Sequence, residues 1–223
     1  FHDYDKVALL DKFRKETVEA INNRISLNPI LNSFQKVVHE YNIEWKLIDR
    51  FLKSMEMDLE TVKYDQVNYE NYILGSAEVV GLMCLRVFVK GDNSVYINLK
   101  PFAMSLGSAF QKVNFLRDAK VDYEVLGRVY FPGVNISSLD AESKREIEID
   151  IEKDFKHALL GIKQLPADSR MGVYLAYFYY KNLFNKIKAL PAQKILTERI
   201  RIPNSRKFGL MFQCVIRHQL NML

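Results

Sequence analysis

The sequence predicts an all-α protein, and two observations carry that prediction. Apolar residues recur at three- and four-residue spacing through long windows, which is typical of amphipathic helices. The nine glycines and six prolines fall mostly between these windows, where they would end one helix and begin the next. Because the sequence shows neither strand-like alternation nor a linker, we expect one all-α domain over residues 1–223.

The first half of the chain predicts four helices. Asn28 and Pro29 end the first and begin the second, because proline is favoured in the first turn of a helix. A Lys-Gly-Asp-Asn turn at 90–93 ends the fourth. The expected ranges are 5–26, 29–41, 43–59 and 69–90.

Four more helices are expected in the second half, around one irregular stretch. Residues 127–138 contain Pro132 and Gly133, which is typical of a loop. Pro166 begins a later helix and Pro191 ends it. The expected ranges are 101–125, 141–164, 166–190 and 203 to the C-terminus.

Composition narrows the function classes. Hydrophobic residues make up 48% and charged residues 26%, as in folded globular proteins, and two cysteines cannot build a disulfide framework or a zinc site. The net charge of +5 is spread along the chain, so we expect no nucleic-acid partner; polyanionic small molecules or an anionic membrane surface are compatible with it. The most apolar run, 79–89, is short and interrupted by Arg86, so we predict no membrane-spanning helix.

A stripe of polar residues on the predicted fifth helix is the main functional signal. Gln111, Asn114, Asp118 and Asp122 are spaced by three, four and four residues, so they fall within an arc of roughly 80°. Carboxylate and amide oxygens suit Mg²⁺, which binds through one or two carboxylates plus substrate phosphates. A solvated helix face carries the same residue types, so both interpretations stay open from spacing alone.

Cationic side chains and small residues extend this pattern. Arg117 and Arg128 flank the stripe and could bind phosphate oxygens in a bidentate manner. The same face of the helix continues through Gly107 to Met104. The sequence therefore predicts a site for magnesium and a diphosphate at one end of this face.

These residues resemble the second aspartate-rich motif of the phytoene/squalene synthase family. The pattern Q-x-x-N-x-x-R-D-x-x-x-D at 111–122, preceded by L-G-S-A at 106–109 and followed by G-R-V-Y-F-P at 127–132, is similar to the family motif. Segments 51–59 and 72–83 resemble two further family elements. Since these pieces occur together and in order, the resemblance covers most of the chain.

The sequence departs from the family pattern at several points. Leu74 replaces a tyrosine, and Glu78 and Ser54 replace glycines. The family's first aspartate-rich motif, D-x-x-x-D, is missing; Asp3 and Asp5 are too close together to form it. We expect that the sequence begins downstream of that motif and lacks N-terminal helices, and that the chain as given makes no product. A pseudoenzyme is the alternative.

The resemblance implies a fold and an activity. It implies an isoprenoid-synthase-type helical bundle around a central cavity, with Mg²⁺ or alternatively Mn²⁺ as cofactor and isoprenyl diphosphates as substrates. The favoured function is phytoene synthase-like: head-to-head condensation of two geranylgeranyl diphosphates through a cyclopropyl diphosphate, in carotenoid biosynthesis. Squalene or dehydrosqualene synthase acting on farnesyl diphosphate is the alternative, and a non-catalytic assembly factor of the same fold is a further one. A cytoplasmic location is expected, with peripheral membrane contact and oligomeric state left open.

The resemblance also implies roles for individual residues. Mg²⁺ would be bound by Asp118 and Asp122 with Asn114, and Gln111 would support the metal–diphosphate cluster. The diphosphate would be contacted by three arginines, and catalysis would involve Arg117 and two tyrosines. The arginines are Arg117, Arg128 and Arg199, and the tyrosines are Tyr72 and Tyr179.

A channel for the isoprenyl tail is expected between the fourth and fifth helices. On the predicted fourth helix Tyr72, Ser76, Val79 and Met83 share one face, apolar below a polar tip. Gly107 and Met104 would face them from the fifth helix, with Met83 and Met104 as the floor of the channel. From Asp118 to Met104 is fourteen residues, or roughly 21 Å, which is of the order of an extended geranylgeranyl tail.

Overall fold

An all-α architecture is confirmed in the part of the chain that the structure describes. The structure is a computed structural model that describes residues 4–59, 64–125, 127–134, 139–195, 200–203, 207, 209 and 211–214. The elements are α1 (Lys6–Asn23), α2 (Pro29–Glu40), α3 (Trp45–Met57), α4 (Gln66–Ile73), η1 (Leu74–Glu78), α5 (Val79–Phe88), α6 (Asn93–Glu124), α7 (Ala141–Ile162), α8 (Ala167–Lys188) and α9 (Ala192–Ile195).

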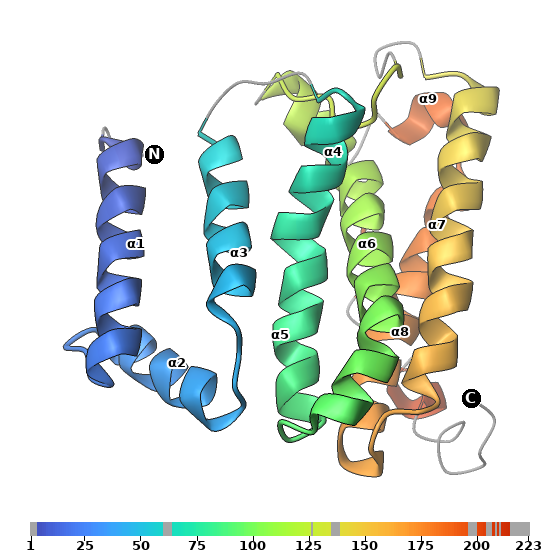
Figure 1. Ribbon diagram of the computed structural model, residues 1–223. Coiled ribbons are helices and arrows are strands. Elements are labelled where there is room, and N and C mark those ends of the chain that lie inside the picture. Colours follow the sequence, from blue (N-terminus) through green and yellow to red (C-terminus); the bar gives the residue numbers. More distant parts are fainter. Residues whose placement is uncertain are drawn as a thin grey trace.

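The helices form a bundle in which α6 is central. α1 and α2 lie at one edge and α7 at the other, with α3 and α5 between (Figure 1). α6 packs against η1, α5, α7 and α8, and most extensively against α7. The helix expected from 203 onwards falls largely outside the described residues, and positions 207, 209 and 211–214 within it are helical.

The fifth predicted helix begins eight residues earlier than expected. Asp92 is its N-cap, and its side chain accepts hydrogen bonds from the backbone N–H groups of Ser94 and Val95 at 2.9 and 3.0 Å. Pro101, expected near the start, lies inside the helix. Proline removes the hydrogen bond to the carbonyl of Ile97. Both Ile97 and Pro101 are exposed, so the interruption falls on the outer side of α6.

The predicted fourth helix is continuous but contains a π-helical turn. α4, η1 and α5 follow one another without a break, and the five residues of η1 form the π-helical segment. Glycines let the backbone around it approach its neighbours closely: a Cβ on Gly75 would lie 2.6 Å from the Ser54 Cβ, and one on Gly107 would lie 2.7 Å from the Ala77 carbonyl oxygen. The π-turn is therefore held between α3 and α6.

The α4–η1–α5 helix is long and apolar enough to meet a length-and-composition criterion for a membrane span. The stretch is Gln66–Phe88, with a mean hydropathy of 1.3. This differs from the sequence prediction, which considered only the shorter run 79–89. Core helices of globular proteins pass the same criterion, and this one lies in the middle of the bundle, in contact with α3 and α6 (Figure 1).

Candidate active site

The predicted polar stripe lies on a single long helix, α6, with all four side chains half-buried. The opposite side of this helix is core: Val113 and Leu116 have no exposed surface. Asp118 and Asp122 stand one turn apart near the C-terminal end of α6. Burial and the neighbouring Asp118 raise the pKa of Asp122 to about 6. The two carboxylates are thus close enough to repel each other.

The carboxylate pair fits a divalent cation that is completed by other ligands. No group of three or more carboxylate, imidazole or thiol side chains occurs at metal-binding distance among the described residues. Asp118 and Asp122 supply two carboxylates, which is the protein contribution usual for a Mg²⁺ that also binds phosphate oxygens. The Arg117 guanidinium pairs with Asp118, with its Nε 3.0 Å from Oδ2.

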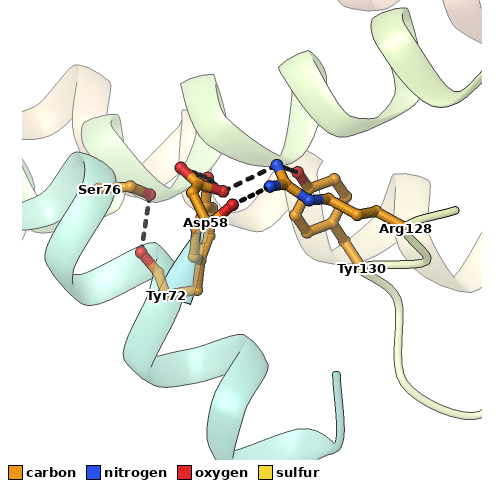
Figure 2. A network of polar contacts seen from close by, with 5 residues as sticks. All are labelled: Asp58, Tyr72, Ser76, Arg128 and Tyr130. Carbon is orange, nitrogen blue, oxygen red and sulfur yellow. Dashed lines mark hydrogen bonds and ion pairs between the residues drawn. The ribbon is translucent and has the colours of Figure 1, made fainter. Parts of the chain in front are cut away.

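A third carboxylate, that of Asp58, enters the site from the end of α3. Figure 2 shows the network around its carboxylate. Arg128 donates from Nη1 to Asp58 Oδ1 at 2.9 Å and from Nη2 to the Asp58 backbone carbonyl. The Tyr72 hydroxyl donates to both carboxylate oxygens at 3.1 and 3.2 Å. Arg128 Nη1 also donates to the Tyr130 hydroxyl at 3.4 Å, so Tyr72 and Arg128 meet at the carboxylate and Tyr130 joins the network through Arg128.

Burial and neighbouring charges shift the pKa values of the carboxyl groups in this site. Burial raises the pKa of Asp58, while the Arg128 charge and the Tyr72 hydrogen bond oppose that rise. The Asp58 charge in turn acts on Asp122 and raises its pKa further. The site therefore contains three carboxylates, and Arg117 and Arg128 supply the positive charge beside them.

Aromatic rings line the site next to Asp58. Phe115 of α6 stacks on Tyr130 with ring centroids 4.0 Å apart. The Tyr72 ring lies 5.9 Å from Phe115 and 5.5 Å from Tyr130. Aromatic faces attract cations, most strongly where water is excluded. This wall could stabilise a carbocation that forms beside the carboxylates.

An apolar cavity of about 440 Å³ begins where the stripe ends. Its polar end is formed by Gln111 and Asn114, and the Tyr180 hydroxyl of α8 donates to Asn114 Oδ1 at 3.2 Å. The other lining residues come mainly from η1, α5, α6, α7 and α8, and include Ser76, Ala77, Val80, Gly81, Cys84, Phe88, Leu99, Phe102, Ala103, Leu106, Gly107, Leu165, Gly172 and Ala176. The cavity thus runs down the bundle from the polar stripe.

The predicted tail channel is displaced by one residue on the fourth helix. Ser76 lines the cavity, but Val80 and Cys84 do so in place of Val79 and Met83. Val79 and Met83 are not among the residues that line it, and both pack in the apolar cluster that contains Leu82. The prediction assumed 3.6 residues per turn, and the π-turn inserts one extra residue that rotates everything after it.

On α6 the structure brings only part of the predicted channel to this cavity. Met104, like Met83, is not among the residues that line it. Gly107 lines the cavity as expected, but a side chain there would point at the Ala77 carbonyl. Leu99 and Leu165 lie at the end of the cavity remote from the stripe.

The tyrosine predicted on the seventh helix is not found at the cavity. Tyr179 does not line it; its ring lies 5.8 Å from that of Tyr180 and 5.9 Å from the Lys207 amine. Tyr180, the next residue along, occupies the mouth and stacks on Phe110 at 4.0 Å. Arg199 lies outside the described residues.

Sequence reasoning missed Asp58 as a site residue. The residue lies within the segment 51–59 that resembles a family element, so the signal was present, but its partner Arg128 is 70 residues away. Tyr180 was missed because residues 177–180 are all aromatic, so the sequence does not tell which of the four side chains faces the cavity.

Together, the helical bundle, its apolar cavity and the adjoining cluster of carboxylates and arginines define an isoprenoid-synthase-type protein. A sequence profile described as squalene/phytoene synthase matches residues 2–145. The chain belongs to this family, whose members are prenyltransferases that carry out head-to-head prenyl condensation, bind isoprenyl diphosphates and typically depend on Mg²⁺.

Solved structures share the fold. A dehydrosqualene synthase crystallised in complex with a ligand is 18% identical with a TM-score of 0.83, and the match covers 96% of this chain and 80% of that one. Squalene synthase HpnC from Alicyclobacillus acidocaldarius is 18% identical with a TM-score of 0.73, covering 84% of this chain and 75% of that one. No match was found among curated proteins.

Proposed function

We propose that this protein condenses two molecules of geranylgeranyl diphosphate head to head, as a phytoene synthase does. The observation that carries the proposal is the position of the carboxylate and arginine groups directly above an apolar cavity. One helix, α6, supplies both parts: Asp118 and Asp122 at the charged end, and Leu99 at the far end of the cavity. A diphosphate head and an apolar tail would each meet matching chemistry.

The length of the cavity supports a C20 tail. From Asn114 at the mouth to Leu99 is fifteen residues of α6, or roughly 22 Å at about 1.5 Å per residue. An isoprene unit contributes four carbon–carbon bonds of about 1.5 Å to the chain, so it extends about 5 Å and four units extend about 20 Å. A C15 tail also fits, which keeps farnesyl diphosphate and squalene-type products as the second candidate.

The residues of this chain would divide the work of the reaction. Arg117 and Arg128 would bind diphosphate oxygens, exchanging their present carboxylate partners for the substrate. A divalent cation held by Asp118 and Asp122 would neutralise charge on the leaving diphosphate. The rings around Tyr72 would face the allylic cation after ionisation, and the apolar cavity would keep water away from it.

Product analysis tests the proposal. The protein is incubated with Mg²⁺ and either geranylgeranyl or farnesyl diphosphate, and the hydrocarbon products are identified. A C40 product is expected. Exclusive formation of a C30 product would favour the second candidate, and absence of any product would favour the assembly factor.

Occupation of the cavity can be measured separately. Cys84 lines the cavity and is exposed to it, whereas Cys214 has no exposed surface. Alkylation of Cys84 by an uncharged thiol reagent should slow when an unreactive geranylgeranyl diphosphate analogue is bound with Mg²⁺. Alkylation of Cys84 at an unchanged rate under saturating analogue would show that the tail does not enter this cavity.

A further inference from the structure

One hydroxyl beside the candidate active site is buried without a hydrogen-bond partner. Tyr64 is 6% exposed, and its Oη has no hydrogen-bond partner among the described residues. Such groups are rare, because burying a hydroxyl away from water without a new hydrogen bond costs free energy. Tyr64 therefore needs an explanation that packing of its ring does not give.

The position of Tyr64 connects it to the site. Its ring meets Tyr72 edge-on at 5.3 Å and lies 5.0 Å from Tyr130. Both neighbours make hydrogen bonds to the Asp58–Arg128 pair. The hydroxyl also senses this pair electrostatically, because the Asp58 charge raises its pKa and the Arg128 charge lowers it.

We propose that Tyr64 is a further substrate-binding residue, whose hydroxyl donates a hydrogen bond to a diphosphate oxygen. This inference rests on the proposed function and extends it to a residue that the motif resemblance did not include. Arg128 is the group most suited to bring an anionic oxygen into reach, since it already lies against the rings that enclose Tyr64.

The chemistry of the hydroxyl agrees with a donor role. Burial raises the pKa of Tyr64 above its usual value, so the hydroxyl keeps its proton at neutral pH and above. A protonated phenol can donate to an anionic oxygen, and a hydrogen bond to a charged acceptor is stronger than one between neutral groups. The diphosphate would thus satisfy the hydroxyl that the described part of the chain leaves unpaired.

Tyr64→Phe tests the proposal, since it removes the hydroxyl and keeps the ring. The probe is inorganic pyrophosphate with Mg²⁺, and its affinity for the full protein is measured by isothermal titration calorimetry. We expect the variant to bind pyrophosphate about tenfold more weakly or worse, as for loss of a hydrogen bond to a charged group. We expect its melting temperature to be unchanged or higher, because an unsatisfied buried hydroxyl is removed.

Tyr69→Phe is the matched control. Tyr69 is buried in the same cluster, but its hydroxyl senses Asp150 and Asp154 of α7 instead of Asp58. The control should bind pyrophosphate as the unmodified protein does. If Tyr64→Phe binds equally well, or if it melts at a lower temperature with unchanged binding, the proposal is wrong while the proposed function stands. If the unmodified protein itself does not bind pyrophosphate with Mg²⁺, both fail.

Discussion

Filling the lower half of the cavity from α8 should shorten the substrate that the protein accepts. Gly172 lines the cavity, and a Cβ there would have no atom within 4 Å, so a large side chain can be placed without a backbone clash. Tyr180 marks the mouth on the same helix, eight residues later. Gly172 therefore lies roughly 12 Å below the mouth.

The size of the effect follows from this depth. Gly172→Phe would leave roughly 12 Å of open cavity, enough for about two isoprene units of about 5 Å each. Excluding even one unit of five carbons, at about 0.8 kcal/mol per carbon, would remove about 4 kcal/mol of tail burial. That corresponds to about a thousandfold in affinity. Imperfect packing of the natural tail would make this loss smaller. We therefore expect kcat/KM for geranylgeranyl diphosphate to fall about 100- to 1,000-fold.

The assay compares kcat/KM for C20, C15 and C10 diphosphates, with the melting temperature measured in parallel. Gly172→Ala is the control, since it adds only a methyl group and should stabilise the helix by roughly 0.8–1.0 kcal/mol. A folded Gly172→Phe protein with undiminished kcat/KM for geranylgeranyl diphosphate would refute this path for the tail. Gly107→Phe is a poorer test, because its side chain would strike the Ala77 backbone.

Three further outcomes are expected. Asp118→Ala or Asp122→Ala should abolish turnover, because each removes a metal ligand. The circular dichroism spectrum should stay unchanged, because neither residue lies on the core face of α6. Near-normal turnover would contradict the metal assignment. Asp58→Asn should lower kcat at least tenfold and destabilise the fold by about 1–2 kcal/mol in urea titrations, less than for a fully buried pair because both partners are partly exposed. Burial and Asp154 raise the pKa of Glu78 to about 7, so its protonated form is favoured on folding. The contribution of Glu78 to the free energy of unfolding is fully present below its unfolded pKa near 4.5 and is lost as the pH rises through 7. Glu78→Gln should therefore raise the melting temperature at pH 8 and have little effect at pH 4.

Much of the fold could be predicted because the helices carry a regular apolar pattern and are separated by proline and glycine. The start of α6 could not be placed this way, since Pro101 looks like a boundary when the Asp92 cap eight residues earlier is overlooked. In the site, spacing alone placed Asp118 and Asp122 on one face. Spacing could not join Asp58 to Arg128, because that contact depends on how α3 meets the loop after α6.

The side of the tail channel formed by η1 and α5 shows a different limit of sequence reasoning. A helical period predicts which residues share a face only while the number of residues per turn is constant. η1 changes that number for one turn, and the face that follows is built from Val80 and Cys84 instead of Val79 and Met83. Nothing in the residue types of 74–78 marks the change; the close contacts of Gly75 and Gly107 with neighbouring backbone are visible only in three dimensions.

The π-turn also bears on how this helix could change in evolution. A π-turn holds one residue more than an α-helical turn, so deleting a single codon within 74–78 would convert it to ordinary α-helix and leave the orientation of α5 unchanged. Val80 and Cys84 would keep their places at the cavity, each one position earlier in the sequence. Lineages that differ by one residue in this segment would therefore present the same tail pocket, and an alignment without a gap there would pair the wrong residues.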